Sequence, residues 1–233
     1  MLAMKVSPDT ATTAQTSADQ TRLALVEAAL RLFGQKGFEG TSTREIAAAA
    51  NSNIGSIAYH FGGKEGLRIA CAEHIAATMG TLSAQVLATA PEPDDLTAET
   101  ARALLRTVVT TMATFLLGRP ESGDFVQFIL RELAHPTAAL DTVYNRMFEP
   151  MHRRLCRIWQ AATGEDAESE ATKLTVFTLI GQIVYFRIGR EAVLRRMGWT
   201  GIGAEQMAAV IAAATANLDA MLAARNPDPS KGN

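Results

Sequence analysis

Apolar residues recur at intervals of three and four positions along the chain between residues 19 and 225. Residues 22–36, for example, carry Leu23, Val26, Leu30 and Phe33 on one face. This spacing is typical of an amphipathic α-helix and differs from the strict alternation of a half-buried strand. Alanine, which loses least freedom in a helix, is abundant, whereas runs of Val, Ile and Thr are scarce. The sequence therefore predicts an all-α fold.

Composition and charge narrow the class of protein. The chain has 233 residues, of which 48% are hydrophobic and 20% charged, as in a soluble globular protein, and its formal net charge is −2. Cys71 and Cys156 are far apart and lack disulfide-framework spacing, which favours a reduced, cytoplasmic protein. No uncharged apolar run reaches the ~18 residues of a membrane span, so we expect no membrane association.

The pattern divides the chain into two helical domains between short tails. We expect disordered tails at 1–18 and 226–233, a three-helix N-terminal domain at 19–79 and a larger C-terminal helical domain at 80–225. A proline inside a helix removes a hydrogen-bond donor, so Pro150 predicts a kink. The expected helices cover 22–36, 44–50, 54–60, 64–88, 97–118, 123–134, 137–163, 168–196 and 204–224, with a loop at 91–95.

The N-terminal domain has the pattern of a helix-turn-helix unit. Gly37 ends the first helix, and Asn51-Ser52-Asn53 is a turn between two short helices. Thr41, Ser42 and Thr43 all offer N-caps to the first short helix, and Ser42 in that position would form a capping box with Glu45. The buried positions would be Ile46, Ala47, Ala50, Ile54, Ile57 and Phe61. The polar or small residues left outside suit phosphates and base edges, and they are Thr43, Arg44, Asn53, Gly55, Ser56, Ala58, Tyr59 and His60.

Several blocks of this domain resemble the DNA-binding domain of the TetR family. They are the segment from Val26 to Phe33, Gly37-Phe38, Thr41-Ser42, Ile46-Ala47, Ala50, Tyr59-His60-Phe61, Lys64-Glu65 and Leu67. The resemblance implies a homodimer whose second domain binds a small-molecule effector. Position by position it implies phosphate contacts from Thr43, Tyr59, His60 and Lys64, and base contacts from Asn53, Gly55 and Ser56.

Two features of the domain depart from a strongly basic DNA-binding surface. Residues 1–80 hold as many acidic as basic side chains, which counts mildly against a nucleic-acid function. The second short helix contains neither Arg nor Lys, so we expect water, DNA shape and thymine-methyl contacts to matter more than guanine recognition. Asn51 stands where the family often has glycine, and Asn tolerates the left-handed backbone of such a turn.

The C-terminal half contains a second recognisable stretch. Residues 125–137, FVQFILRELAHPT, together with 148–150 and Gly181-Gln182, resemble the TetR subgroup typified by a regulator of sensitivity to cefoperazone and chloramphenicol. An apolar face with a charged pair could line an effector pocket. The alternative is a core helix with its charges at the solvated edge. The candidate pocket residues are Phe125, Phe128, Arg131, Glu132, His135, Phe148, Trp159 and Tyr185.

The last two predicted helices are candidates for a dimer interface. The segment 174–188 is apolar almost all round, and the final helix carries a long apolar stripe. Two such helices from each subunit could form an isologous bundle, although burial within one chain remains the alternative. The candidate interface residues are Phe177, Gly181, Val184, Met207, Val210, Ile211, Ala214, Leu218 and Met221.

These features predict a ligand-responsive transcriptional repressor that an effector releases from a palindromic DNA operator. No catalytic, metal-binding or cofactor motif is evident, so we expect neither enzyme activity nor a cofactor. One alternative is a metal- or redox-sensing regulator using Cys71, His74, His152 and Cys156, since each pair shares a helix face. A more remote one is a helical enzyme with Glu132 and His135 as acid and base.

Overall fold

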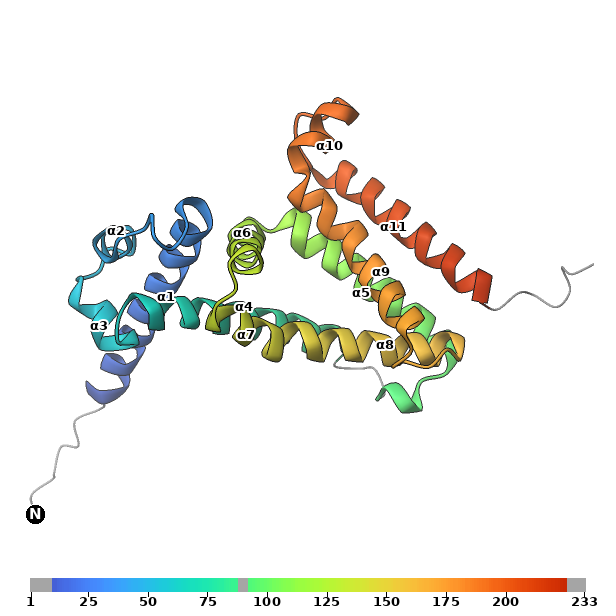
Figure 1. Cartoon of the computed structure of the whole chain (residues 1–233), viewed down its shortest axis with the longest axis horizontal. Coiled ribbons are helices and arrows are strands. Elements are labelled where there is room, and N and C mark those ends of the chain that lie inside the picture. Colours follow the sequence, from blue (N-terminus) through green and yellow to red (C-terminus); the bar gives the residue numbers. More distant parts are fainter. Residues whose placement is uncertain (1–9, 88–91, 226–233) are drawn as a thin grey trace, which may run out of the picture.

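The computed structural model describes residues 10–87 and 92–225, which are helical with short connections and contain no strand (Figure 1). The all-α prediction is therefore confirmed. The elements are α1 (Thr10–Lys36), α2 (Thr43–Ala49), α3 (Gly55–Phe61), α4 (Lys64–Leu87), η1 (Pro93–Asp95), α5 (Ala98–Gly118), α6 (Glu121–Ala134), α7 (Ala138–Val143), η2 (Tyr144–Phe148), α8 (Glu149–Thr163), α9 (Glu170–Ile188), α10 (Arg190–Met197) and α11 (Ala204–Arg225).

Helix boundaries differ from the sequence prediction at three places. The expected disordered tail at 1–18 is wrong for residues 10–18, which belong to α1. No glycine or proline interrupts residues 10–33, and extending an existing helix costs far less than starting one. The expected helix at 168–196 is divided at Gly189 into α9 and α10. The predicted disorder of residues 1–9 and 226–233 lies outside the described residues.

The third difference is the form of the irregularity at Pro150. The helix from Ala138 to Thr163 continues through η2, a π-helical turn that immediately precedes Pro150 in the first turn of α8. Because proline donates no hydrogen bond and crowds the carbonyl one turn earlier, a widened turn relieves the conflict. The helix is thus irregular at the expected place.

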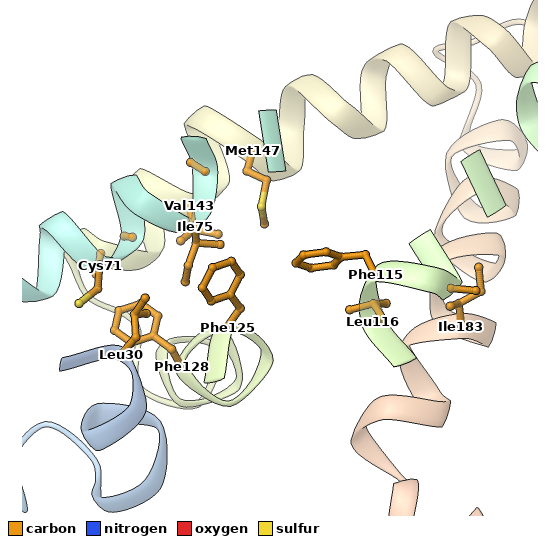
Figure 2. Packing of buried hydrophobic residues seen from close by; sticks show 14 of the residues in the cluster. Leu30, Cys71, Ile75, Phe115, Leu116, Phe125, Phe128, Val143, Met147 and Ile183 are labelled. Carbon is orange, nitrogen blue, oxygen red and sulfur yellow. The ribbon is translucent and has the colours of Figure 1, made fainter. Parts of the chain in front are cut away.

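The N-terminal helices pack directly on the larger domain. The helix α4 is continuous across residues 79 and 80, where the sequence placed a domain boundary, and α6 lies against α1 while α7 lies against α4. Figure 2 shows Leu30 of α1, Cys71 and Ile75 of α4, and Phe125 and Phe128 of α6 meeting in one cluster. The two parts of the chain therefore share a continuous apolar core.

The distal part of the molecule is organised around α5. The helices α8, α9 and α11 all contact α5, and Trp159, Ile183 and Leu218 are fully buried among them. By length and composition alone, α11 is also the one described helix that could cross a membrane. One stripe of α11 is buried on α5 and α9, as in a surface helix of a globular protein.

Candidate nucleic-acid interface

The helix α2 begins with a complete capping box. Ser42 Oγ accepts a hydrogen bond from the Glu45 backbone N–H at 3.1 Å, and the Ser42 backbone N–H donates to Glu45 Oε2 at 2.8 Å. Lys36 Nζ donates to Glu45 Oε1 at 2.8 Å, and these hydrogen bonds lower the pKa of the Glu45 carboxyl to about 2. The predicted capping box is confirmed, and it fixes where α2 starts relative to α1.

The turn between α2 and α3 depends on two asparagines. Asn51 has φ of 49°, and it is the one non-glycine residue with positive φ in the described part of the chain. Asn can replace glycine here because its short side chain reduces the strain of the left-handed backbone. Asn53 Oδ1 accepts a hydrogen bond from the Gly55 N–H at 2.9 Å. Ile54 occupies the position directly before α3 and gives no side-chain hydrogen bond, so the Asn53 amide oxygen is the side-chain acceptor at the start of this helix.

The helix α3 exposes one face and buries the other. Ile57 is buried against the domain core, whereas the Tyr59 side chain on the outer face is 83% exposed. The Tyr59 and His60 rings meet edge to face at 4.9 Å, so the two aromatic rings support each other. Asn53 and Gly55 are exposed, and Ser56 is half-buried. A small, partly polar surface is therefore available to a DNA groove.

The junction of α3 and α4 is tight. Gly62 ends α3 with a left-handed φ of 72°. A β-carbon on Gly66 would lie 1.9 Å from the Phe61 carbonyl oxygen, so only glycine fits at that position. Lys64 opens α4 with its ammonium 4.1 Å from the centre of the Phe38 ring, which holds this cation beside the end of α3.

These elements bring the predicted DNA-contact residues to one end of the molecule. They come from the start of α2, from the α2–α3 turn, from α3 and from the first residue of α4, which lie together at the left of Figure 1. Thr43 and Arg44 lie in the first turn of α2, and Arg44 is exposed. The buried counterparts Ile46, Ala47 and Ile57 hold the two short helices on α1.

The helix α6 of the C-terminal domain forms hydrogen bonds to α1 of the DNA-binding unit. Arg131 donates from Nε to the Gly34 carbonyl at 2.6 Å and from Nη2 to the Gln35 carbonyl at 2.8 Å. These carbonyls belong to the last turn of α1, where a cation is favoured by the helix dipole and satisfies unpaired acceptors. The guanidinium of Arg131 therefore caps the helix that supports α2 and α3.

A buried ion pair forms a second link between α6 and the N-terminal unit. Arg68 of α4 donates from Nε to Glu132 Oε1 at 2.7 Å, and Thr137 Oγ1 donates to Glu132 Oε2 at 2.6 Å. The Arg68 guanidinium also lies 4.4 Å from the Phe38 ring centre. Sequence reasoning missed Arg68 and Thr137, because nothing local to residue 68 indicates a partner 64 positions away.

Comparisons with known proteins match both parts of the chain. The model of bacterial regulatory proteins of the tetR family matches residues 25–71, and that of the C-terminal domain of the HTH-type transcriptional dual regulator CecR matches residues 101–225. The chain is 37% identical over 213 residues to CecR of Shigella flexneri, across 88% of this chain and 92% of that protein. The chain belongs to the TetR family. It is thus a transcriptional regulator with a helix-turn-helix DNA-binding domain, and not an enzyme.

Other transcriptional regulators are similar to this chain in sequence or in fold. The HTH-type transcriptional repressor NicS of Pseudomonas putida is 32% identical over 118 residues, which cover 51% of this chain and 50% of NicS. A solved regulator structure from Pseudomonas aeruginosa PAO1 has a TM-score of 0.66 at 20% identity, covering 88% of this chain and 91% of that one. The structure of AibR with isovaleryl coenzyme A and operator DNA has a TM-score of 0.60 at 16% identity, covering 89% and 98%.

The predicted effector-pocket residues of this TetR-family chain have varied surroundings. Phe125, Phe128 and Glu132 are buried, and Trp159 is buried with its indole N–H donating to Glu165 at 2.8 Å. Phe148 is half-buried, His135 follows α6 as an exposed residue, and Tyr185 is exposed. Arg131 and Glu132 are engaged by α1 and α4, so their charges hold the DNA-binding unit instead of facing an effector.

Three of the predicted dimer residues face the interior of their own subunit. Val210, Ala214 and Leu218 are 3%, 4% and 0% exposed and form the buried stripe of α11 that packs on α5. This part of the prediction is wrong, because the apolar stripe of α11 from which the interface was predicted is buried in the core of the same subunit. Phe177 and Gly181 are exposed, while Val184, Met207, Ile211 and Met221 are half-buried.

The cysteine and histidine pairs lie in separate environments. Cys71 donates its thiol proton to the Val26 carbonyl of α1, and burial raises its pKa. His74 lies edge-on to Phe125, and burial lowers its pKa. His152 stacks on Phe177 of α9 at 4.0 Å, and Cys156 lies beside it. Among the described residues, no group of three or more His, Cys, Asp or Glu could hold a metal ion.

Proposed function

We propose that this TetR-family regulator is a cytoplasmic repressor that binds a palindromic operator as a homodimer and releases it on binding a small effector. The observation that carries the proposal is the double attachment of α6. Arg131 caps α1, and Glu132 binds Arg68 of α4. Both helices that support α2 and α3 are therefore bound to α6 of the C-terminal domain. Any displacement of α6 must therefore change the position of α3.

The outer face of α3 would enter the major groove. Asn53, Gly55 and Ser56 would face base edges, while Thr43, Arg44, Tyr59, His60 and Lys64 would contact phosphates or the groove wall. A base edge can be read by the Asn53 amide, and the absence of Arg and Lys from α3 shifts the remaining selectivity toward shape and thymine methyl groups.

An exposed apolar stripe on α9 supports the homodimer. Leu174, Phe177, Tyr185 and Ile188 are 57%, 59%, 57% and 50% exposed, and Gly181 lies between them. Beside the stripe, a pocket of about 400 Å³ is lined by Thr178, Gln182, Asn217, Ala220 and Met221. Gln182 Oε1 accepts from Asn217 Nδ2, but its buried Nε2 has no hydrogen-bond partner among the described residues. A second copy would cover this surface and offer Gln182 a partner.

The effector site would lie where α6 meets α5 and η2. Phe115, Phe125 and Met147 converge there from the three elements (Figure 2), and Phe115 and Phe125 are 6.2 Å apart between ring centres. An apolar molecule entering between these side chains would displace α6 directly. AibR, which shares this fold, was crystallised with isovaleryl coenzyme A and operator DNA, and this supports the proposal of a small-molecule effector.

The experiment measures DNA affinity and effector response together. Full-length protein is titrated onto labelled DNA from its own upstream region, and isovaleryl coenzyme A, chloramphenicol and cefoperazone are then added as first probes. We expect an effector to weaken DNA binding, because it must bind more tightly to the conformation that has low affinity for DNA. Its binding should also raise the thermal midpoint of the DNA-free protein. An effector that stabilises the protein yet leaves operator affinity unchanged would contradict ligand-controlled repression.

A further inference from the structure

A pocket of about 290 Å³ lies between α8 and the η1 segment, and its walls are rich in arginine. Arg153, Arg154 and Arg157 of α8 line one side, while Glu92, Pro93 and Glu168 contribute to the rest. In Figure 1 this region, where green η1 lies below α8, is at the opposite end of the molecule from α3. Operator DNA bound to α3 would not reach it.

Of the two acidic residues in the pocket wall, Glu92 and Glu168, the second is already neutralised. Glu168 binds Arg153 at 3.1 Å and Lys173 at 2.8 Å, and these contacts lower the pKa of its carboxyl. Arg153 also binds Glu149 at 3.0 Å. The adjacent guanidinium of Arg154 therefore adds positive charge beside two carboxylates, Glu149 and Glu168, that already have cationic partners.

Arg154 has an unused donor in this pocket. Its Nε is buried and has no hydrogen-bond partner among the described residues. Buried donors are nearly always satisfied, and the shielded position of Nε keeps bulk water from satisfying it. The Nε and Nη groups of arginine form a planar fork that matches two oxygens of one anion, so a small rotation of the guanidinium would present both donors to a bound group.

We propose that this pocket binds the phosphate group of a small molecule, with Arg154 as the bidentate donor and Arg157 as a second cation. A tetrahedral oxyanion suits several guanidinium groups better than a single carboxylate does. The volume exceeds what a phosphate alone would fill, so the group is either inorganic phosphate or the phosphorylated end of a larger metabolite. This binding is separate from effector-controlled DNA release and is measured without DNA.

The test is calorimetric titration of the full-length protein with potassium phosphate, adenosine monophosphate and acetate, each at matched ionic strength in chloride. We expect saturable binding of phosphate or of the monophosphate, and much weaker binding of acetate. Tighter binding of the monophosphate would identify a phosphorylated metabolite as the ligand, and equal binding would identify phosphate itself. Arg154→Gln should weaken binding by roughly tenfold or more.

The matched control is Arg195→Gln, which removes an exposed arginine of α10 and should leave phosphate affinity within about twofold. If circular dichroism shows that Arg154→Gln does not fold, an NMR titration of the wild-type protein tests the proposal instead. Its arginine Nε–H resonances are followed by NMR, and one buried resonance should shift with phosphate at the calorimetric affinity. Absence of saturable phosphate binding, binding of acetate as tight as phosphate, or unchanged affinity in Arg154→Gln would overturn the proposal.

Discussion

Arg68 Nε lies 2.7 Å from Glu132 Oε1, and this ion pair joins the DNA-binding unit to α6 of the sensor domain. The two side chains are 12% and 3% exposed, so the pair is shielded from salt and water. Thr137 takes up the second oxygen of Glu132, which leaves the carboxylate held from both sides. Removing the charge of Arg68 would leave the Glu132 carboxylate buried without a cation, and removing that of Glu132 would leave Arg68 with only the exposed carboxylate of Glu65, 3.8 Å away.

Glu132→Gln should therefore be strongly destabilising. We expect the free energy of unfolding in urea to fall by about 3–5 kcal/mol, the usual cost of breaking a buried pair on one side. The double variant Arg68→Met, Glu132→Leu replaces both charges with apolar groups and should recover most of that loss. A double variant as unstable as Glu132→Gln would show that the cost is one of packing, not of an orphaned charge.

Arg131→Ala tests the capping of α1 by α6. Its guanidinium donates two charged hydrogen bonds to Gly34 and Gln35, but the residue is exposed, so we expect a modest loss of about 1–2 kcal/mol in the free energy of unfolding. Operator affinity should also change, because α1 supports both short helices. The control is Arg119→Ala, an exposed residue paired with Glu121, which should change stability by less than about 0.5 kcal/mol. Equal effects of the two substitutions would argue against a capping role.

Gly66→Ala should disrupt the junction of α3 and α4. The added methyl would lie 1.9 Å from the Phe61 carbonyl, so the backbone must move, at a cost of at least ~1–3 kcal/mol. Gly80→Ala in the same helix meets nothing within 4 Å and should stabilise α4 by about 0.5–1 kcal/mol. Thermal midpoints measured side by side should therefore move in opposite directions, and a parallel change would contradict the tight junction.

The capping box predicts an unusual acid titration. The hydrogen bonds from Lys36 and Ser42 lower the pKa of Glu45 to about 2, whereas its ordinary value is 4.5. Because the folded-state pKa is depressed, the stability that the ionised carboxylate contributes is present above pH 4.5 and is lost as the pH falls toward 2. NMR titration of the Glu45 carboxyl should give a midpoint near 2, which Ser42→Ala should raise. A wild-type midpoint near 4.5 would show that the box does not persist in solution.

Local signals explain what the sequence could predict. The capping box at Ser42, the stop at Gly37 and the turn at Asn51 act within a few residues, so the helix-turn-helix unit was predictable nearly to its boundaries. Arg131 and Glu132 were singled out as pocket residues, yet their partners are in α1 and α4. No spacing within α6 reveals those partners, because the contacts depend on how distant helices pack.

The final helix shows the same limit for burial. The sequence of α11 has apolar residues on nearly every side, and the stripe with the larger side chains is taken by the subunit's own core. Periodicity shows that one face of such a helix is buried, but it does not show whether that face packs on the same subunit or on a second copy of the chain. Exposure of Phe177 and its neighbours on α9 is visible only once the chain is folded.

The most direct test of the account is the affinity of full-length protein for its own upstream DNA over a range of salt concentrations, measured by fluorescence anisotropy. The wild type should bind its operator more tightly than random DNA, with affinity falling steeply as salt rises. In the double variant Asn53→Ala, Tyr59→Ala, the ratio of operator to random-DNA affinity should fall by tenfold or more, on the order of 1–3 kcal/mol. The matched control, Tyr144→Ala, removes another exposed tyrosine on η2 and should bind as the wild type does. Equal binding of all three proteins to operator and to random DNA would contradict DNA recognition by α3.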